Sequence, residues 1–557
     1  MKRLTLILLL TIIYSCKNQK AAPLSSISQD STSTKVFSSL YVDAQNHKLQ
    51  FESIDILNYK FNLTLTDESN EIEGLAEITV KFNKSITSFN LDLVEQQSNN
   101  SGMKVEAVLE NNLPISFKHN SNQLLLYIKE TRTEEIRKYS IKYHGIPADG
   151  LIISKNKYGD RTFFGDNWPD RAKNWLPVVD HPSDKAAVEW DITAPSHYQT
   201  IGNGSLIERT NLDGKTTLTR WKMQTPIPTK VMVIGVAQFA VENLEEIHNI
   251  PVSSWVYPQE RINGFKDYAL AVPVLDFMIN NVGPYPFEKL ANVQSKTLFG
   301  GMENAGNIFY NEKSVTGNGD YEAVIAHEIA HQWFGDSASE LNWHHVWLSE
   351  GFATYFENLF YENRYGRDSF VKKLKEDRLK ALLYYNKNQS PIVDATITDY
   401  SQLLSPHTYE KASYVLHMLR KELGDKLFWQ GIKTYYDTFK YSNALSEDFQ
   451  HIMELTSGKD LNSFFKQWLY QSGQPILDIV WNTGDSLNII ITQTQENLFL
   501  FPIDFKINFE DGSSIIITIH VNDRIQKNTF PKYKNISSIE TDPDTWLFFD
   551  LNAIKTE

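Results

Sequence analysis

The spacing of apolar residues changes twice along this 557-residue chain, and each change marks a change of secondary structure. Over residues 40–241 apolar and polar residues alternate, as in the run from Tyr59 to Leu65, which predicts strands. From Phe265 the apolar period becomes 3.6, which predicts helices, and after residues 473–475 (Gly-Gln-Pro) the alternation returns. We therefore expect a multidomain α+β protein with a β-rich first domain, a mostly helical centre and a small β-sandwich.

Glycine and proline residues divide this pattern into elements and domains. The expected helices cover residues 265–281, 321–334, 346–365, 367–384, 409–423, 425–439 and 461–471. In the last part, Asp511-Gly512 predicts a hairpin turn between two strands. The expected domains are a β-rich domain at 40–241, a mostly helical domain at 242–472 and a β-sandwich at 473–557, with no helical domain after it.

Composition excludes several classes of protein. With 54 Lys and Arg against 68 Asp and Glu, the net charge is −14, which argues against a nucleic-acid partner because such a protein needs a basic face. The single cysteine excludes an internal disulfide and a zinc ribbon. A content of 41% hydrophobic and 22% charged residues is typical of a globular protein.

The first residues predict export from the cytoplasm. Met1-Lys2-Arg3 is followed by an apolar run from Leu4 to Tyr14, which suits a signal sequence and is too short to span a bilayer. The run ends directly before Ser15-Cys16, which resembles a bacterial lipobox, so we expect a signal peptide at 1–15 and lipidation of Cys16. Residues 16–39 then form a tether, and the protein is anchored in the cell envelope, facing the periplasm or the exterior. The alternative is a conventional signal peptide with an incidental cysteine.

The segment His327-Glu328-Ile329-Ala330-His331 lies inside an expected helix. Positions i and i+4 share one helix face, so both imidazoles can reach one metal ion. Two neutral nitrogens suit Zn²⁺, which in catalytic sites takes a third protein ligand and keeps one position for water. Glu328 can take the proton of that water. The alternative is a pair of surface histidines on an amphipathic helix.

Two acidic residues of the next expected helix extend this site. Glu350 follows His331 after 18 intervening residues, and a helical hairpin can fold it back onto the metal as the third ligand. Glu357 shares its helix face and can hydrogen-bond the outer nitrogen of a ligand histidine, which fixes the tautomer. Glu357 is equally compatible with a solvated surface charge.

The stretch Gly300-Gly301-Met302-Glu303-Asn304 follows a strand-like segment. Glycine lets a backbone approach a ligand closely, and the carboxylate of Glu303 can bind an ammonium group. By itself this stretch is also compatible with a simple turn.

Three motifs together resemble those of the gluzincin aminopeptidases of the aminopeptidase N family, which includes the leukotriene-hydrolysing aminopeptidases. They are Gly300–Asn304, His327–His331 with Glu350, and Tyr409-Glu410-Lys411-Ala412, and the resemblance covers residues 40–557. It implies a thermolysin-like catalytic domain.

The resemblance also implies roles for these residues. One Zn²⁺ per chain would be held by His327, His331 and Glu350, and Glu328 would be the general base on the metal-activated water. Tyr409 would donate a hydrogen bond to the oxyanion.

The substrate implied is a peptide with a free N-terminus. Glu303 would pair with its α-amine, and the glycines before it would hold the peptide backbone.

The chain departs from the family pattern in three places. Residues 176–180 (Leu-Pro-Val-Val-Asp) carry valine where some relatives have a Gln or Glu that binds the amine, and Asp180 is the nearby residue that can compensate. His344-His345 stands where many relatives have an acidic residue, and we expect both to be structural or solvent-facing. Without the helical domain of many relatives, the cleft is expected to be open or closed by another subunit.

The leading interpretation is thus a lipid-anchored zinc aminopeptidase that takes N-terminal residues from peptides. A zinc endopeptidase is disfavoured by Glu303, and no residue specifically supports an added non-peptide hydrolase activity. A catalytically inactive peptide-binding lipoprotein is disfavoured because it has no need of Glu328. The side-chain preference, the physiological substrate, the membrane and the oligomeric state stay open.

Overall fold

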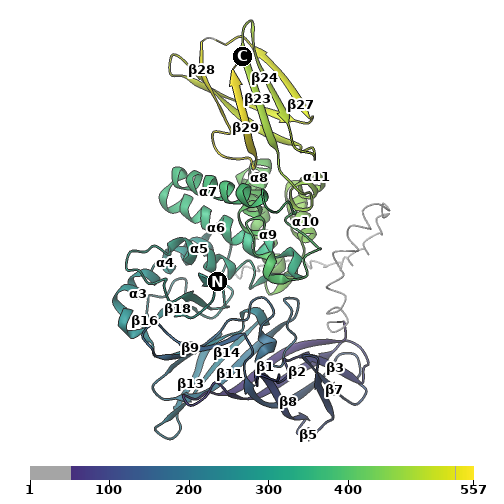
Figure 1. Cartoon of the computed structure of the whole chain (residues 1–557), viewed down its shortest axis with the longest axis vertical. Coiled ribbons are helices and arrows are strands. Elements are labelled where there is room, and N and C mark those ends of the chain that lie inside the picture. The colour runs from purple at the N-terminus through teal and green to yellow at the C-terminus, as the bar shows by residue number, and fades with distance from the viewer. Residues whose placement is uncertain (1–51, 534, 557) are drawn as a thin grey trace, which may run out of the picture. The chain divides into compact units, whose positions relative to one another are not determined.

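The alternating residues of the first domain form a large twisted sheet in the computed structural model, which describes residues 52–533 and 535–556 (Figure 1). The side chains of Tyr59, Phe61 and Leu63 are all buried, as the alternation predicts. The predictions for residues 1–39, including the signal segment, Cys16 and the tether, lie outside the described residues. Among the described residues, no helix has both the length and the apolar character that crossing a bilayer requires.

This sheet has eight strands, and β1 is central to it because it pairs antiparallel with β2 and parallel with β11. In spatial order the strands are β13 (Ser205–Asn211), β14 (Thr216–Pro228), β11 (Lys185–Pro195), β1 (Ile54–Thr64), β2 (Ile72–Phe82), β8 (Glu135–Ile146), β4 (Gly102–Glu110) and β5 (Leu113–Pro114).

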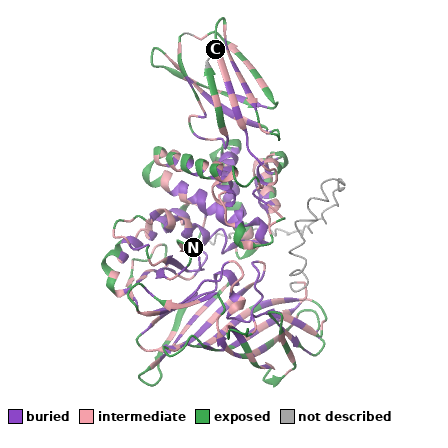
Figure 2. Cartoon of the chain, viewed as in Figure 1, coloured by how far each residue is buried: buried purple, intermediate pink, exposed green. Residues whose placement is uncertain are grey.

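Two smaller sheets complete the first domain. One contains β3 (Ser88–Asp92), β7 (Gln123–Tyr127) and β6 (Phe117–Asn120). The other contains β12 (Gln199–Gly202), β15 (Ile234–Ala237), β10 (Arg161–Gly165) and β9 (Leu151–Lys155). Buried and more exposed residues alternate along many of these strands (Figure 2). The predicted β-rich first domain is confirmed.

A five-stranded sheet opens the central region. Its order is β16 (Ala240–Asn243), β17 (Val252–Val256), β18 (Leu290–Ser295), β20 (Asn307–Asn311) and β19 (Gly301–Met302). β19 is an edge strand, antiparallel to β20, and it contains two residues of the glycine-rich stretch. The change of sheet falls between β15 and β16, so β16 runs across the boundary expected at residue 241. The other domain bounds stay predictions.

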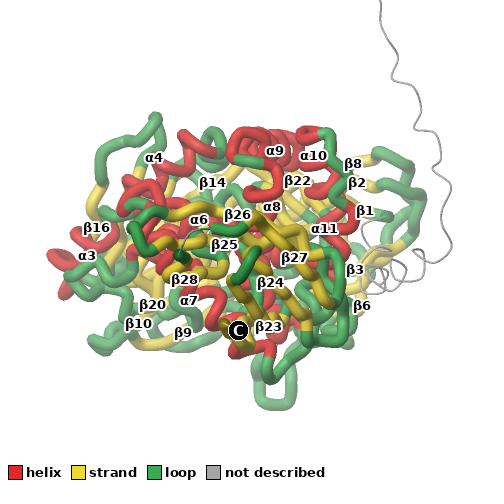
Figure 3. The backbone as a smooth tube through the Cα atoms, turned by 90° about the horizontal axis from the view of Figure 1, so that it is seen from above, coloured by secondary structure: helices red, strands yellow, loops and turns green. Residues whose placement is uncertain are grey.

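Helices make up most of the remaining central region (Figure 3). They are α3 (Arg261–Tyr268), α4 (Ala271–Asn281), α5 (Glu322–His331), α6 (Trp347–Tyr365), α7 (Arg367–Tyr385), α8 (Ala412–Leu423), α9 (Asp425–Phe439), α10 (Ser446–Ser457) and α11 (Asn462–Phe465). A two-stranded sheet of β21 (Ala338–Glu340) and β22 (Ser442–Ala444) lies among them, and π-helical turns cover His407–Lys411 and Lys466–Tyr470.

The structure differs from the expected helices in several places, and the helix expected over 461–471 is the short α11 followed by the π-helical turn at Lys466–Tyr470. The single helix expected over 265–281 is two helices, because Pro273 has no N–H to bond the carbonyl of Ala269, which instead accepts from Val272 N at 3.2 Å. The sequence pattern did not predict α10, whose Phe449 and Met453 are buried. The helix expected from residue 409 starts with a π-helical turn.

The last region is the predicted β-sandwich, which is confirmed. One sheet contains β27 (Ile525–Pro531), β24 (Ser486–Gln493), β23 (Ile476–Thr483) and β29 (Asp550–Thr556), and the other contains β26 (Ser514–Val521), β25 (Phe501–Phe509) and β28 (Ile536–Thr541). The hairpin of β25 and β26 turns at Asp511-Gly512, where Gly512 has a φ of 81°.

Candidate metal centre

Three possible ligand atoms converge where α5 meets α6. The Nε2 atoms of His327 and His331 are 3.0 Å apart. Glu350 Oε2 lies 3.3 Å from the first nitrogen and 3.2 Å from the second. Tetrahedral ligands about 2.0–2.1 Å from one Zn²⁺ are separated by roughly 3.3 Å, so the triangle has the size that one zinc ion requires.

The outer nitrogens of the two rings fix how the rings face this triangle. His331 Nδ1 lies 3.2 Å from the Phe334 carbonyl and 3.0 Å from Ser349 Oγ. His327 Nδ1 faces Glu357 Oε2 at 3.6 Å. With the protons on Nδ1, both Nε2 lone pairs and the Glu350 carboxylate face one another, and such acceptors repel unless a cation lies between them. The donor set therefore fits Zn²⁺.

Glu357 lies behind the triangle, on α6. Its second carboxylate oxygen is 2.5 Å from Lys373 Nζ on α7. The carboxylate is thus placed between a lysine and the outer nitrogen of His327, which is the position expected for a residue that orients a ligand.

Glu328 lies on α5 between the two histidines and is 7% exposed. Burial raises its pKa to about 7, against the opposing effect of His327 and His331. A Cβ atom at position 301 would overlap the Glu328 carboxylate, so a larger residue at this position of β19 would displace that side chain. The glycine-rich strand and the candidate base therefore lie in direct contact. A Cβ atom at position 300 would meet open space, so a larger residue would fit there.

Glu303 follows β19, and its side chain is 5% exposed. Gln332 Nε2 donates to its backbone carbonyl at 2.7 Å. The Glu303 carboxylate oxygen Oε1 has no hydrogen-bond partner within residues 52–533 and 535–556. Such a buried, unsatisfied carboxylate oxygen is costly, and it marks a position where a ligand can donate a hydrogen bond.

Tyr409 lies on the π-helical turn before α8. Its ring stacks on that of His327, with centroids 5.7 Å apart and planes 8° apart. Burial raises the pKa of the Tyr409 hydroxyl, and the charges of Glu350 and Glu303 raise it further. The hydroxyl therefore keeps its proton at neutral pH and can donate a hydrogen bond.

A cavity of about 500 Å³ joins these groups. Its lining residues include Trp168, Phe299, Gly300, Gly301, Met302, Glu303, His327, Glu328, His331, Glu350, Glu357, Lys373, Leu404 and Tyr409. Each site residue predicted from the described part of the sequence lines it except Asn304. The side chain of Asn304 is fully buried, and neither of its polar atoms has a hydrogen-bond partner in the described part of the chain.

One expectation about departures from the family pattern needs correction, and for the two histidines the structural alternative holds. Asp180 does not line the cavity, because its carboxylate accepts from Lys173 N at 3.0 Å and from Thr229 Oγ1 at 2.9 Å inside the first domain. His344 and His345 are 3% and 2% exposed, so neither faces solvent. They bond other groups and are not part of the ligand triangle.

Sequence reasoning missed two aromatic residues of the cavity, Trp168 and Phe299. Phe299 directly precedes Gly300, so its position in the chain was a usable signal. Trp168 lies in a loop of the first domain, more than 130 residues before the motifs, and only the fold brings it to the cavity.

Comparison with known proteins agrees with this site. Residues 56–231 match the peptidase M1 N-terminal domain, and residues 268–468 match the peptidase family M1 domain. The chain is 27% identical to "Probable aminopeptidase 2" of Sulfurisphaera tokodaii over 67% of its own length and 48% of that protein. It is 28% identical to "Glutamyl aminopeptidase" of Bitis rhinoceros (60% and 36%) and 27% identical to "Aminopeptidase N" of Oryctolagus cuniculus (56% and 36%).

The chain thus spans about half or less of the length of these relatives. The first match covers most of the β-rich domain, and the second contains the metal triangle, Glu328 and Tyr409. This chain belongs to peptidase family M1.

Proposed function

We propose that the protein is a zinc aminopeptidase, which hydrolyses the first peptide bond of peptides that have a free N-terminus. The observation that carries this proposal is the buried Glu303 carboxylate, whose Oε1 is unpartnered among the described residues and which lines the same cavity as the metal triangle. An α-ammonium group would satisfy that oxygen. A blocked terminus would leave it desolvated and unpaired, at a cost of several kcal/mol.

Family M1 is zinc-dependent, and His327, His331 and Glu350 are the residues that would hold the ion. A bound Zn²⁺ would polarise the scissile carbonyl and lower the pKa of water. The remaining steps belong to side chains of this chain. Glu328 takes the proton of the attacking water and later gives it to the leaving amine. Tyr409 donates a hydrogen bond to the oxygen on which negative charge develops.

β19 supports the peptide backbone. Among the described residues β19 is an edge strand with no neighbouring strand on one side, so an extended peptide can pair with it beside Glu328. With the amine at Glu303, only the first peptide bond can lie beside the metal triangle, and this geometry separates an aminopeptidase from an endopeptidase.

The test is an assay of purified protein on aminoacyl-arylamides and on matched N-acetylated peptides, with Glu328→Gln in parallel. We expect turnover of free-amine substrates alone, loss of turnover with a chelator, and an almost inert variant. Preferred cleavage of acetylated peptides would instead identify an endopeptidase. Zinc binding without turnover of any substrate would identify a peptide-binding protein.

We also propose that the protein is held at the cell envelope by a lipid on Cys16. The support is the apolar run that ends just before the only cysteine of the chain. Labelling with a radioactive fatty acid in a bacterial host tests this proposal. We expect label and membrane association in the wild type and neither in Cys16→Ser, and unlabelled wild-type protein would contradict the proposal.

A further inference from the structure

One glutamine links the glycine-rich segment to the helix that carries the two ligand histidines. Gln332 directly follows His331 at the end of α5 and is fully buried. Its Nε2 donates to the Glu303 carbonyl at 2.7 Å, and its Oε1 accepts from Gly306 N at 2.8 Å. The amide therefore holds both ends of the four-residue stretch that begins with Glu303.

The other two bonding positions of this amide are also occupied. The Tyr285 hydroxyl donates to Gln332 Oε1 at 3.1 Å, and Gln332 Nε2 donates to Asp336 Oδ2 at 2.9 Å. A side-chain amide has two donor hydrogens and two acceptor sites, so all four are used. A backbone carbonyl only accepts and a backbone N–H only donates, so the contacts with Glu303 and Gly306 also fix which end of the amide faces each partner.

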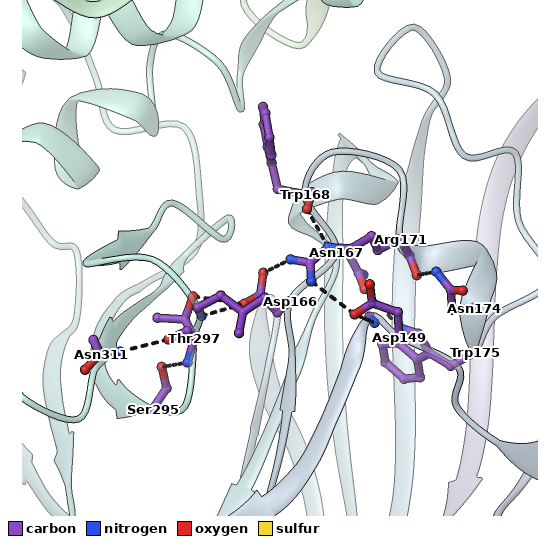
Figure 4. Close-up of polar contacts among 12 residues, drawn as sticks. Asp149, Asp166, Asn167, Trp168, Arg171, Asn174, Trp175, Ser295, Thr297 and Asn311 are labelled. Carbon is purple, nitrogen blue, oxygen red and sulfur yellow. Dashed lines mark hydrogen bonds and ion pairs between the residues drawn. The ribbon is translucent and has the colours of Figure 1, made fainter. Parts of the chain in front are cut away.

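The start of the same segment is held by the first domain (Figure 4). Asp166 is fully buried and is paired with Arg171. Its other carboxylate oxygen accepts from Thr297 Oγ1 at 3.1 Å and from Leu298 N at 3.0 Å. These contacts fix the segment relative to the first domain, and none of them involves α5. The position of Glu303 relative to the metal triangle therefore depends on the other end of the segment, where Gln332 binds it.

The distance from Glu303 to the metal triangle decides which peptide bond can be cleaved. A substrate whose amine pairs with Glu303 must also place its first carbonyl at the triangle, and both contacts form together at one separation. A displacement of about 1 Å in such a geometry can lower the rate about a hundredfold. The contact of Gly301 with Glu328 brings β19 beside α5, and the directional hydrogen bonds of Gln332 fix the Glu303 backbone along that helix.

We infer that Gln332 is a positioning residue, which sets the distance between the Glu303 carboxylate and the metal triangle so that one substrate can bind both. This inference rests on the proposed aminopeptidase function. Gln332 does not line the cavity, so it acts through the backbone of Glu303 and not by contact with a substrate.

The test uses two ligands that differ only in the α-amine, L-alanine hydroxamate and propionohydroxamic acid. Both carry a hydroxamate group, which binds zinc, and the first can also pair with Glu303. In calorimetric titrations of the zinc-loaded wild type we expect the amine-bearing ligand to bind about tenfold more tightly or better. Gln332→Met has a side chain of similar length that makes none of the four hydrogen bonds, so this ratio should fall to about threefold or less. The affinity for propionohydroxamic acid and the zinc content should not change.

Gln493→Met is the matched control. Gln493 is also buried; its Nε2 donates to the Phe499 carbonyl at 2.8 Å and its Oε1 accepts from Phe499 N at 3.0 Å, but it lies in the β-sandwich, away from the cavity lining. This variant should lose stability and keep both affinities. Gln332→Asn keeps the amide but is one methylene group shorter, so it cannot reach both ends of the stretch. It should lower the ratio as well, and it decides the question if Gln332→Met does not fold.

The outcomes separate this inference from the proposed function. A wild-type ratio in the Gln332 variants would overturn the inference alone. An equal loss of affinity for both hydroxamates would also overturn it, because the glutamine would then act on the metal ligands and not on Glu303. If the wild type itself binds the two hydroxamates equally, Glu303 does not take the amine, and the proposed function fails.

Discussion

Two clusters of buried charge in this protein are built on opposite principles. In the metal triangle, His327, His331 and Glu350 bring three acceptor atoms together with no fixed positive charge between them. The second cluster, which we call the interdomain cluster, consists of Lys185, Lys230, Asp336 and Glu340. There Lys230, from the first domain, supplies the positive charge that faces Glu340.

Partners are provided within the interdomain cluster. Lys230 Nζ lies 2.6 Å from Glu340 Oε1, and both residues are at most 1% exposed. Lys185 Nζ donates to the carbonyls of Asp336 and Ser337 at 3.2 and 2.7 Å. Burial alone would lower the pKa of Lys230, but the carboxylate of Glu340 raises it. The comparison indicates that the triangle is a site for a cation from solution, whereas the interdomain cluster joins two parts of the chain.

The largest expected difference between the two clusters appears when one carboxylate of each is replaced. Glu350→Gln removes a zinc ligand, so we expect zinc content after dialysis to fall from about one per chain to near zero, and activity to fall by about a thousandfold or more. Metal content is measured by plasma mass spectrometry.

Glu340→Gln is the matched control, since its carboxylate is equally buried. It should keep its zinc and lose stability. A Glu350→Gln protein that still holds one tightly bound zinc would show that the triangle is not the metal site.

The second prediction concerns Lys230. Lys230→Met leaves the Glu340 carboxylate buried and uncompensated, which costs about 3–5 kcal/mol of unfolding free energy. Urea unfolding followed by circular dichroism measures this loss, and zinc content should not change. The double variant Lys230→Met/Glu340→Met should be less destabilised than the single one, because it removes the unpaired charge. Lys421→Met, which breaks the half-exposed pair with Asp504, should cost about 1 kcal/mol or less.

The two clusters also differ in how far sequence predicts them. The triangle follows from local rules, because four-residue spacing on α5 aligns the histidines and the next helix brings Glu350 back. The β-rich and sandwich regions follow from the same kind of periodicity. Lys230 and Glu340 lie 110 residues apart, and no local sequence rule pairs them. Nor does a local rule bring Trp168 to the cavity. Both arrangements arise from the packing of the first domain against α5 and its flanking segments.

The third prediction concerns Glu357, which contacts the outer nitrogen of His327 in the metal triangle. Glu357→Gln weakens the electrostatic hold on His327 Nδ1 without removing a ligand, so zinc affinity should fall about 10- to 100-fold while one zinc still binds at saturation. Competition with a chromophoric chelator measures the affinity. Lys373→Met removes the lysine partner of Glu357 and leaves the contact with His327, and it should have the smaller effect. Unchanged affinity in Glu357→Gln would make this residue a simple partner of Lys373.

The smallest expected effect is a pH dependence within the interdomain cluster. Burial lowers the pKa of Lys185 to about 7, whereas an unfolded lysine has a pKa of about 10.4. Between these values the unfolded chain holds a proton that the folded chain has lost, so this lysine makes stability increase with pH, by at most about 1.4 kcal/mol per pH unit. The unfolding free energy of the wild type, measured in urea from pH 7 to 9, should therefore rise relative to that of Lys185→Met. If the two proteins keep a constant difference, Lys185 is charged in the folded state throughout. Its two carbonyl partners would then stabilise an ammonium group, and both lysines of the interdomain cluster would be charged.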